Sequence, residues 1–143
     1  MPSGNGAAAL VLSRLARLTG EPRWREAADL QLSYLSWAAQ EHPSGYSFTM
    51  LALLEELWPA GELVCTAREV PAELTSLLRR DPRPGLAVLV KTPETGPELA
   101  DLAPFTREYP IPEGGPRYYL CRNGACMKPA DSISTLISLL EAT

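Results

Sequence analysis

Apolar residues recur every three to four positions through the first part of the chain, which is the spacing of a helix. From Gly6 to Leu18 they cover most of the helical circumference and leave a narrow polar edge at Ser13, Arg14 and Arg17. Gly20 follows as a stop signal. We therefore expect a first helix that is buried on most of its circumference.

Two more helices are predicted before the chain changes character. Pro22 stands where a first helical position should be, and apolar residues recur at helical spacing through Gln40. The segment His42-Pro43-Ser44-Gly45 breaks this helix, and a third helix begins near Phe48 and ends before Pro59. The first 58 residues are thus predicted to be three helices joined by turns.

The pattern changes at Pro59-Ala60-Gly61, because the apolar runs that follow are short and bounded by Pro and Gly. Residues 63–66 and 86–90 are predicted to be buried strands, and residues 71–80 a helix between them. Such a strand–helix–strand unit should be parallel and right-handed. We expect a small sheet that is covered on both faces.

Shorter elements complete the pattern. We expect a helix at residues 97–103, a loop rich in Pro and Gly up to Pro116, and a strand around residues 118–120. A last amphipathic helix follows, and either Asp131 or Ser132 can cap its start.

Two cysteines flank the dipeptide Asn123-Gly124, the preferred sequence of a two-residue type I′ hairpin turn. This turn should place Cys121 opposite Cys126 as a non-hydrogen-bonded pair, with Cα atoms about 4.5 Å apart. A disulfide usually needs about 4.4 to 6.8 Å, so a bond here would lie near the short end, strained and easily reduced. The pattern is therefore compatible with a reversible thiol switch.

Two other roles stay open for the hairpin cysteines. Free cysteines behave as small apolar residues, so two of them on one strand face can simply pack together. Packing is the commoner role, because disulfides are scarce in the cytosol. Two cysteines supply only half of a zinc tetrahedron, which disfavours a metal site. The third cysteine, Cys65, lies in a predicted buried strand and is interpreted as a core residue.

Composition narrows the function classes. Of the 143 residues, 45% are hydrophobic and 21% are charged, as in a globular protein with a core. The net charge of -4 and the scattered Lys and Arg residues argue against nucleic acid as a main partner. No apolar run approaches the roughly 20 residues of a membrane span. Three cysteines are too few for a disulfide scaffold, so we expect a cytoplasmic protein.

The sequence contains no complete catalytic constellation. His42, the only histidine, precedes a proline in a turn, which suits a surface residue better than a triad member. Glu55 and Glu56 are adjacent on a predicted helix, so they point in different directions, and a solvated face explains them. The glycine-containing segments match neither phosphate-loop pattern. We therefore expect no catalytic residue, no metal and no cofactor.

The segment before the first helix offers one candidate binding feature. Ser3 or Asn5 can cap this helix with its side chain. The exposed backbone amides and the positive helix end can also line a ligand cleft. Capping alone is the commoner role, and both interpretations stay open.

Four segments carry a resemblance to a known family: PSGN, AAALVLSRLARLTGEPRWREAA, HPSGYS and YYLCRNGAC-x2-P. The chain resembles the carboxyl-terminal end of the bacterial YyaL-like, spermatogenesis-associated proteins. The resemblance implies a thioredoxin-like domain, then an (α/α) toroid like that of six-hairpin glycosidases and N-acylglucosamine epimerases, then a small α/β tail. Residues 1–58 then look like the last toroid helices, with Ser3 and Asn5 near the toroid mouth. The thioredoxin-like domain and most of the toroid have no counterpart in this sequence.

Pattern and resemblance together predict the α/β class. Residues 1–58 form a three-helix segment, and residues 59–143 form a small Rossmann-like, mostly parallel sheet with a C-terminal β-hairpin and helix.

The leading expectation for function is a non-catalytic accessory or interaction domain. The alternatives are a thiol-redox module using the hairpin cysteines and a carbohydrate-binding remnant. A toroid helix is normally covered on both sides, so residues 1–58 should expose an apolar patch. We therefore expect a homo-oligomer or docking to another chain through residues 1–58, and neither nucleic acid nor membrane as a partner.

Overall fold

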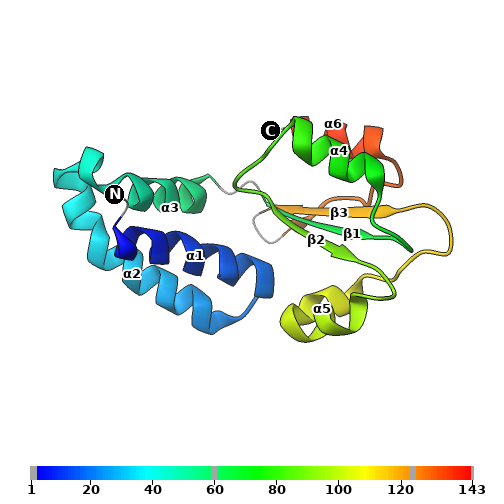
Figure 1. Ribbon diagram of the computed structural model, residues 1–143, viewed down its shortest axis with the longest axis horizontal. Helices are drawn as coiled ribbons and strands as arrows, with labels where there is room; N and C mark the ends of the chain where they lie inside the picture. Colours follow the sequence, from blue (N-terminus) through cyan, green and yellow to red (C-terminus); the bar gives the residue numbers. More distant parts are fainter. Residues whose placement is uncertain (1–2, 59–60, 123–124, 143) are drawn as a thin grey trace. The chain divides into compact units, whose positions relative to one another are not determined.

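The computed structural model describes residues 3–58, 61–122 and 125–142 (Figure 1). The chain divides into two compact units, residues 1–59 and 60–143, and each unit has its own hydrophobic core. The first unit is helical, and the second combines helices with a four-stranded sheet. The predicted α/β class is confirmed. We refer to the two parts as the helical unit and the sheet unit.

The helical unit contains α1 (Gly4–Thr19), α2 (Pro22–Glu41), the 3-10 helix η1 (Pro43–Tyr46) and α3 (Ser47–Leu57). The three predicted helices are confirmed, and η1 occupies most of the expected turn between the second and the third. Helix α1 ends at Gly20, whose φ of 71° provides the left-handed C-cap that glycine adopts without strain. Helix α1 packs against both α2 and α3.

The expectation for the buried face of α1 is wrong in part, because two residues of the predicted polar edge are buried. Ser13 is fully buried and Arg17 is 9% exposed, whereas the leucines of α1 are only half-buried. The helices approach one another through small residues such as Ala9. Arg17 is tolerated at this contact because Glu55 of α3 neutralises it.

The sheet unit contains, in chain order, β1 (Glu62–Thr66), α4 (Ala72–Arg80), β2 (Ala87–Lys91), α5 (Gly96–Leu102), the 3-10 helix η2 (Pro104–Glu108), β3 (Arg117–Arg122), β4 (Ala125–Cys126) and α6 (Ile133–Glu141). Each predicted strand and helix of this part is present. Helix η2 lies in the segment that we expected to be a loop. Ser132 caps α6 by accepting a hydrogen bond from the Thr135 amide at 3.2 Å.

The strand order in the sheet is β2-β1-β3-β4. Strands β1 and β2 are parallel, as predicted for the strand–helix–strand unit. The expectation of a mostly parallel sheet is wrong, because β3 runs antiparallel to β1 and β4 antiparallel to β3. The segment between β2 and β3, which contains α5 and η2, does not carry the chain to the opposite end of the sheet. Strand β3 therefore starts at the edge where β2 ends.

Helices cover both faces of the sheet, with α4 and α6 on one face and α5 on the other (Figure 1). Alternation along β1 and β3 sends Leu63 and Leu120 into the core that α4 and α6 complete. The residues at the next positions, Val64 and Tyr119, lie on the opposite face. Cys121 is two residues beyond Tyr119, so its side chain shares that second face.

Candidate functional site

The predicted opposition of the two hairpin cysteines is confirmed. Cys121 pairs with Cys126 across β3 and β4, their Cα atoms lie 3.9 Å apart, and a disulfide joins them. The Met127 amide donates to the Leu120 carbonyl at 2.9 Å, so the cysteines occupy the adjacent non-hydrogen-bonded position. The turn predicted at residues 123–124 lies outside the described residues.

The two sulfur-bearing residues differ in exposure. Cys121 is only 8% exposed, whereas Cys126 lies on the short edge strand β4 and is exposed. A thiolate that attacks a disulfide must approach one sulfur directly. Cys126 is therefore the sulfur that an external thiol reaches first, and Cys121 is the leaving sulfur.

Tyr109 brings a hydroxyl to both sulfurs. Its oxygen lies 3.7 Å from Cys121 Sγ and 3.6 Å from Cys126 Sγ. The ring packs against Tyr119, with ring centroids 4.5 Å apart, which fixes its position over the second face of the sheet. Burial raises the pKa of Tyr109, and the nearby Tyr119, Glu62 and Glu108 raise it further. The hydroxyl therefore keeps its proton at neutral pH and can donate it to sulfur.

Sequence reasoning did not identify Tyr109 as part of this site. It lies 12 residues before Cys121, in the segment that follows η2, and no local periodicity connects the two. The strand alternation that places Tyr119 and Cys121 on one face was the only available signal. It showed which face carries the sulfurs, but it did not show which loop would cover them.

Cys65 takes no part in the thiol site. It is fully buried in the core of the sheet unit, on the face opposite the disulfide. Burial raises its pKa to about 11, so it remains a neutral thiol at physiological pH. Its position in a buried strand agrees with the interpretation as a core residue.

The remaining sequence candidates lie apart from the cysteines. Ser3 caps α1 by accepting a hydrogen bond from the Gly6 amide at 3.1 Å, whereas Asn5 lies inside the helix. Their role at a ligand cleft stays a prediction. His42 is exposed at the end of α2. Within the described residues, no three His, Cys, Asp or Glu residues come together as a metal site, and no helix is long and apolar enough to cross a membrane.

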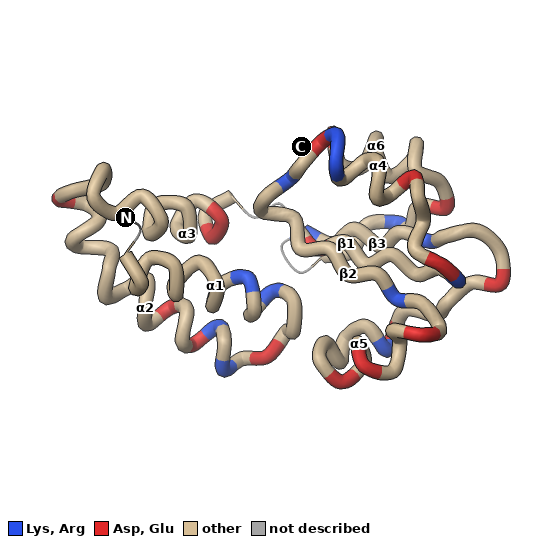
Figure 2. Tube along the Cα trace, viewed as in Figure 1, with Lys and Arg blue, Asp and Glu red and all other residues tan. Residues whose placement is uncertain are grey.

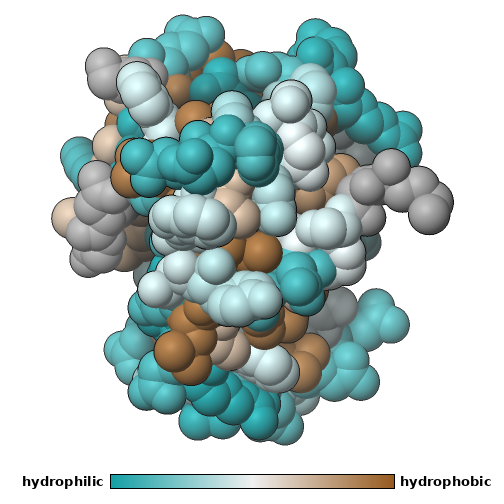
Figure 3. All heavy atoms as spheres, turned by 90° about the vertical axis from the view of Figure 1, so that its left-hand side faces the viewer, coloured by the Kyte–Doolittle hydropathy of each residue, from teal (hydrophilic) through white to brown (hydrophobic). Residues whose placement is uncertain are grey.

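The helical unit exposes many large apolar side chains on α2, on α3 and at the end of α3. We call them the outer apolar residues: Leu30, Tyr34, Trp37, Met50, Leu51, Leu54, Leu57 and Trp58. The three outer apolar residues on α2 follow helical spacing. Leu30, Tyr34 and Trp37 are 73%, 76% and 73% exposed. Figure 3 shows apolar side chains in contact with solvent on the face turned to the viewer.

The charged residues of the helical unit instead face one another. Glu55 binds both Arg14 and Arg17 at 2.5 Å, and Glu56 binds Arg25 at 2.5 Å. The expectation that a solvated face explains the two glutamates is therefore wrong, since the Glu55 side chain is only 11% exposed. They do point in different directions, one to α1 and one to α2. Figure 2 shows basic residues near the end of α1 and the start of α2, and acidic residues near the end of α3.

Comparison with protein-family models, with curated proteins and with solved structures gives no significant match. The chemistry of this chain is therefore inferred from its own geometry.

Proposed function

We propose that the chain is a non-catalytic interaction module that associates with a second copy of itself through the outer apolar residues. The observation that carries the proposal is the distribution of side-chain size in the helical unit. Small residues take part in the contacts between its helices, among them Gly6, Ala9, Ala28 and Ala52, while the outer apolar residues are exposed. The helical unit therefore leaves bulky apolar side chains exposed, and the helices of a second copy can pack against them.

The spacing and charge of the outer apolar residues support helix-on-helix packing. Leu30, Tyr34 and Trp37 stand at positions i, i+4 and i+7, which form one ridge on a helix. No charged residue occurs in α2 between Asp29 and Glu41. Two copies of such a face can meet without repulsion between like charges, and they can exclude water from both ridges.

A lipid surface fits the helical unit less well. Helices that lie on membranes carry many Lys and Arg residues on their polar face. The helical unit has no lysine, and the arginines of α1 and α2 are engaged in ion pairs with its own glutamates. The resemblance of residues 1–58 to the last helices of an (α/α) toroid also favours a helical protein as the occupant.

Sedimentation velocity over a wide range of concentrations tests this proposal. We expect the average mass of the wild-type protein to rise with concentration, and the double variant Tyr34→Ser/Trp37→Ser to remain monomeric with an unchanged circular dichroism spectrum. Leu102→Ser is the matched control, because Leu102 is 65% exposed on α5 of the sheet unit. It should associate like the wild type.

The other outcomes are also informative. A wild-type protein that stays monomeric at high concentration and binds no hydrophobic dye would overturn the proposal. A monomer whose dye binding disappears in the double variant would indicate a separate chain as the occupant, in place of a second copy.

The disulfide favours a second candidate function, reversible thiol–disulfide exchange with a partner dithiol. A partner thiolate attacks Cys126 Sγ and forms a mixed disulfide, and Cys121 leaves as a thiolate that accepts a hydrogen bond from Tyr109. The partner's second thiolate then attacks the mixed disulfide and releases Cys126. The hairpin gains two electrons and two protons, and the partner dithiol becomes a disulfide.

Single cysteine variants test this second candidate. Cys121→Ser leaves the exposed Cys126 and should form a stable mixed disulfide with oxidised glutathione, detected as an added mass. Cys126→Ser leaves the buried Cys121 and should react at least several-fold more slowly. In the wild type, glutathione buffers of graded ratio should interconvert the disulfide and dithiol forms. Equal reactivity of the two variants, or reduction only after unfolding, would contradict the exchange function.

A further inference from the structure

Three segments that are distant in sequence meet at one edge of the sheet. Strands β1 and β2 are parallel, so Arg68 after β1 and Pro93 after β2 both follow carboxyl ends at this edge. Strand β3 is antiparallel to β1, with Arg117 paired to Thr66, so the segment before β3 returns to the same edge. Ligands of open α/β sheets bind beyond the carboxyl ends of the parallel strands.

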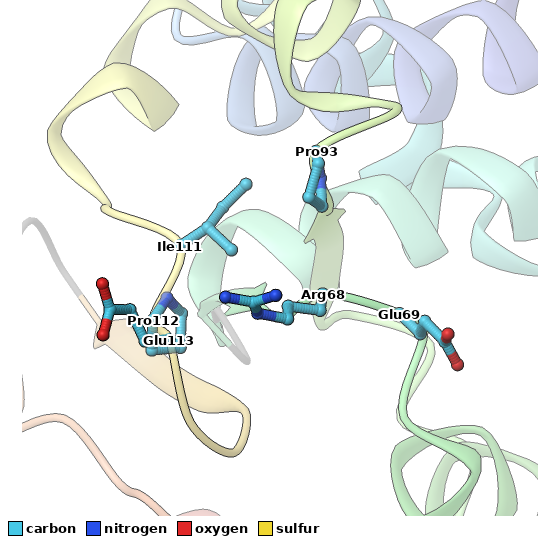
Figure 4. Close-up of a pocket in the computed structure, with 6 residues that line it drawn as sticks. All are labelled: Arg68, Glu69, Pro93, Ile111, Pro112 and Glu113. Atoms are coloured by element: carbon cyan, nitrogen blue, oxygen red, sulfur yellow. The ribbon is translucent and has the colours of Figure 1, made fainter.

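A cleft of about 500 Å³ lies at this edge and is lined by Arg68, Glu69, Pro93, Ile111, Pro112 and Glu113. Figure 4 shows the Arg68 guanidinium directed into the space beside Ile111 and Pro112. The carboxylates of Glu69 and Glu113 point away from this guanidinium. The volume lies in the range of small-molecule sites, which is about 300 to 1,000 Å³.

Arg68 is available to a ligand. Within the described part of the chain it makes no hydrogen bond and no ion pair. Two other arginines of the sheet unit are engaged in ion pairs, Arg83 with Asp81 and Arg107 with Asp101. The free guanidinium presents a planar fork of N–H donors that matches a carboxylate.

Hydrogen bonds fix both walls of the cleft. Lys91 Nζ donates to the carbonyls of Thr106 and Tyr109 at 2.7 and 2.8 Å, which anchors the segment leading to Ile111. Around Pro93, the amides of Thr92 and Thr95 each donate to the other's hydroxyl, at 3.1 and 3.2 Å. Walls that are ordered before binding reduce the entropy lost when a ligand enters.

We propose that this cleft binds a small organic monocarboxylate with a short branched apolar group. Arg68 accepts the carboxylate in a bidentate pair, and the apolar faces of Pro93, Ile111 and Pro112 cover the apolar group. The flanking Glu69 and Glu113 add negative charge at the rim, so a doubly charged phosphate is disfavoured relative to a single carboxylate. This inference goes beyond the interaction function and depends on the sheet unit alone.

Titration of the ¹⁵N-labelled full chain with 4-methylpentanoate tests the proposal by chemical shift. This probe has about eight non-hydrogen atoms, and about 0.5 kcal/mol per atom corresponds to a Kd near 1 mM. We expect saturable shifts at the amides of Arg68, Ile111 and Glu113. The neutral isostere 4-methylpentanamide and inorganic phosphate should give at least about tenfold weaker binding, which separates carboxylate recognition from contact with apolar groups or general anion binding.

Variants separate recognition by Arg68 from general electrostatics. Arg68→Gln should weaken carboxylate binding about tenfold or more. Arg68→Lys should retain only part of the wild-type affinity, because an ammonium group lacks the planar fork of N–H donors. Arg79→Gln removes the same charge from an exposed position on α4 and should bind like the wild type. The proposal is overturned by shifts that do not saturate, by equal binding of the amide, or by unchanged binding in Arg68→Gln.

Discussion

At the scale of single residues, Glu55 joins α3 to α1 by binding both Arg14 and Arg17. Burial alone would raise its pKa, but hydrogen bonds from Arg14 and Arg17 outweigh burial and lower it below the ordinary 4.5. A lowered pKa means that the stabilisation is present above the unfolded value and is lost as the pH falls through the folded value. The contact between α1 and α3 should therefore weaken as the pH falls below the ordinary value of 4.5.

Replacement of Glu55 tests this directly. Glu55→Gln removes the carboxylate that pairs with Arg17, whose side chain is 6% exposed, and should cost about 3 kcal/mol of unfolding free energy. Urea denaturation at pH 7 measures the cost. The neighbouring Glu56→Gln is the control, because its partner Arg25 is 41% exposed, and it should cost about 1 kcal/mol or less. Equal costs for the two variants would contradict the assignment.

Thiol reactivity should differ sharply among the three cysteines. With the pKa of Cys65 raised to about 11 by burial, its thiolate fraction at pH 8 is about one in a thousand. After mild reduction, iodoacetamide should label Cys126 and then Cys121 while Cys65 stays unlabelled until denaturant is added. Peptide mass spectrometry identifies the labelled positions. Early labelling of Cys65 in the folded protein would show that the core of the sheet unit opens readily.

At the scale of elements, the segment after η2 connects the disulfide with the cleft. Tyr109 contacts both sulfurs, and Ile111 and Glu113, only a few residues further on, line the cleft. Reduction replaces the disulfide by two thiols and so changes the hydrogen-bonding partners of the Tyr109 hydroxyl. We expect the amide resonances of residues 109–113 to shift on reduction, while those of α4 move little. Tyr109→Phe should remove most of this difference, which two ¹⁵N spectra per protein can establish.

The end of α6 illustrates a second connection between elements. Arg83 and Arg122 both donate to the Leu140 carbonyl, at 3.0 and 3.3 Å, and Arg122 also binds the Ala142 carbonyl at 2.7 Å. The last carbonyls of a helix have no partner inside the helix, so these guanidinium groups satisfy them. The loop after α4 and strand β3 thereby hold the terminal helix against the sheet.

At the scale of the whole molecule, the two units should unfold separately. The core of the helical unit contains Ala9, Leu32, Leu35 and Ala52, two of them alanines, whereas the core of the sheet unit includes Tyr118 and several leucines. Less buried apolar surface means less stability. We expect the helical unit to unfold at a lower urea concentration than the sheet unit.

The sequence provides a convenient probe for this prediction. All 3 tryptophans, Trp24, Trp37 and Trp58, belong to the helical unit, so fluorescence excited selectively at tryptophan reports on that unit alone. Protection of amides in β1 and β3 from hydrogen exchange reports on the sheet unit. A single transition with the same midpoint by both methods would show that the two units depend on each other for stability.

The sequence by itself determined the features that depend on neighbouring residues. Helical spacing together with Pro22 and Gly20 located the boundaries of α1 and α2, because capping and backbone preferences are local. Cys121 could be placed opposite Cys126 for the same reason, since strand pairing next to a tight turn has only one register. The sequence also predicts that the side chains of Glu55 and Glu56 point in different directions, but it does not identify the arginines that bind them.

Only the tertiary structure decided which surfaces meet. Arg17 is buried because small residues let α1 approach α3 closely, a contact between positions far apart in sequence. The direction of β3 depends on where the segment between β2 and β3 leaves the chain, and Tyr109 reaches the sulfurs from that same segment. The cleft at Arg68 forms from three segments that only the folded sheet brings together. Such contacts arise from the packing of whole elements, which local patterns do not encode.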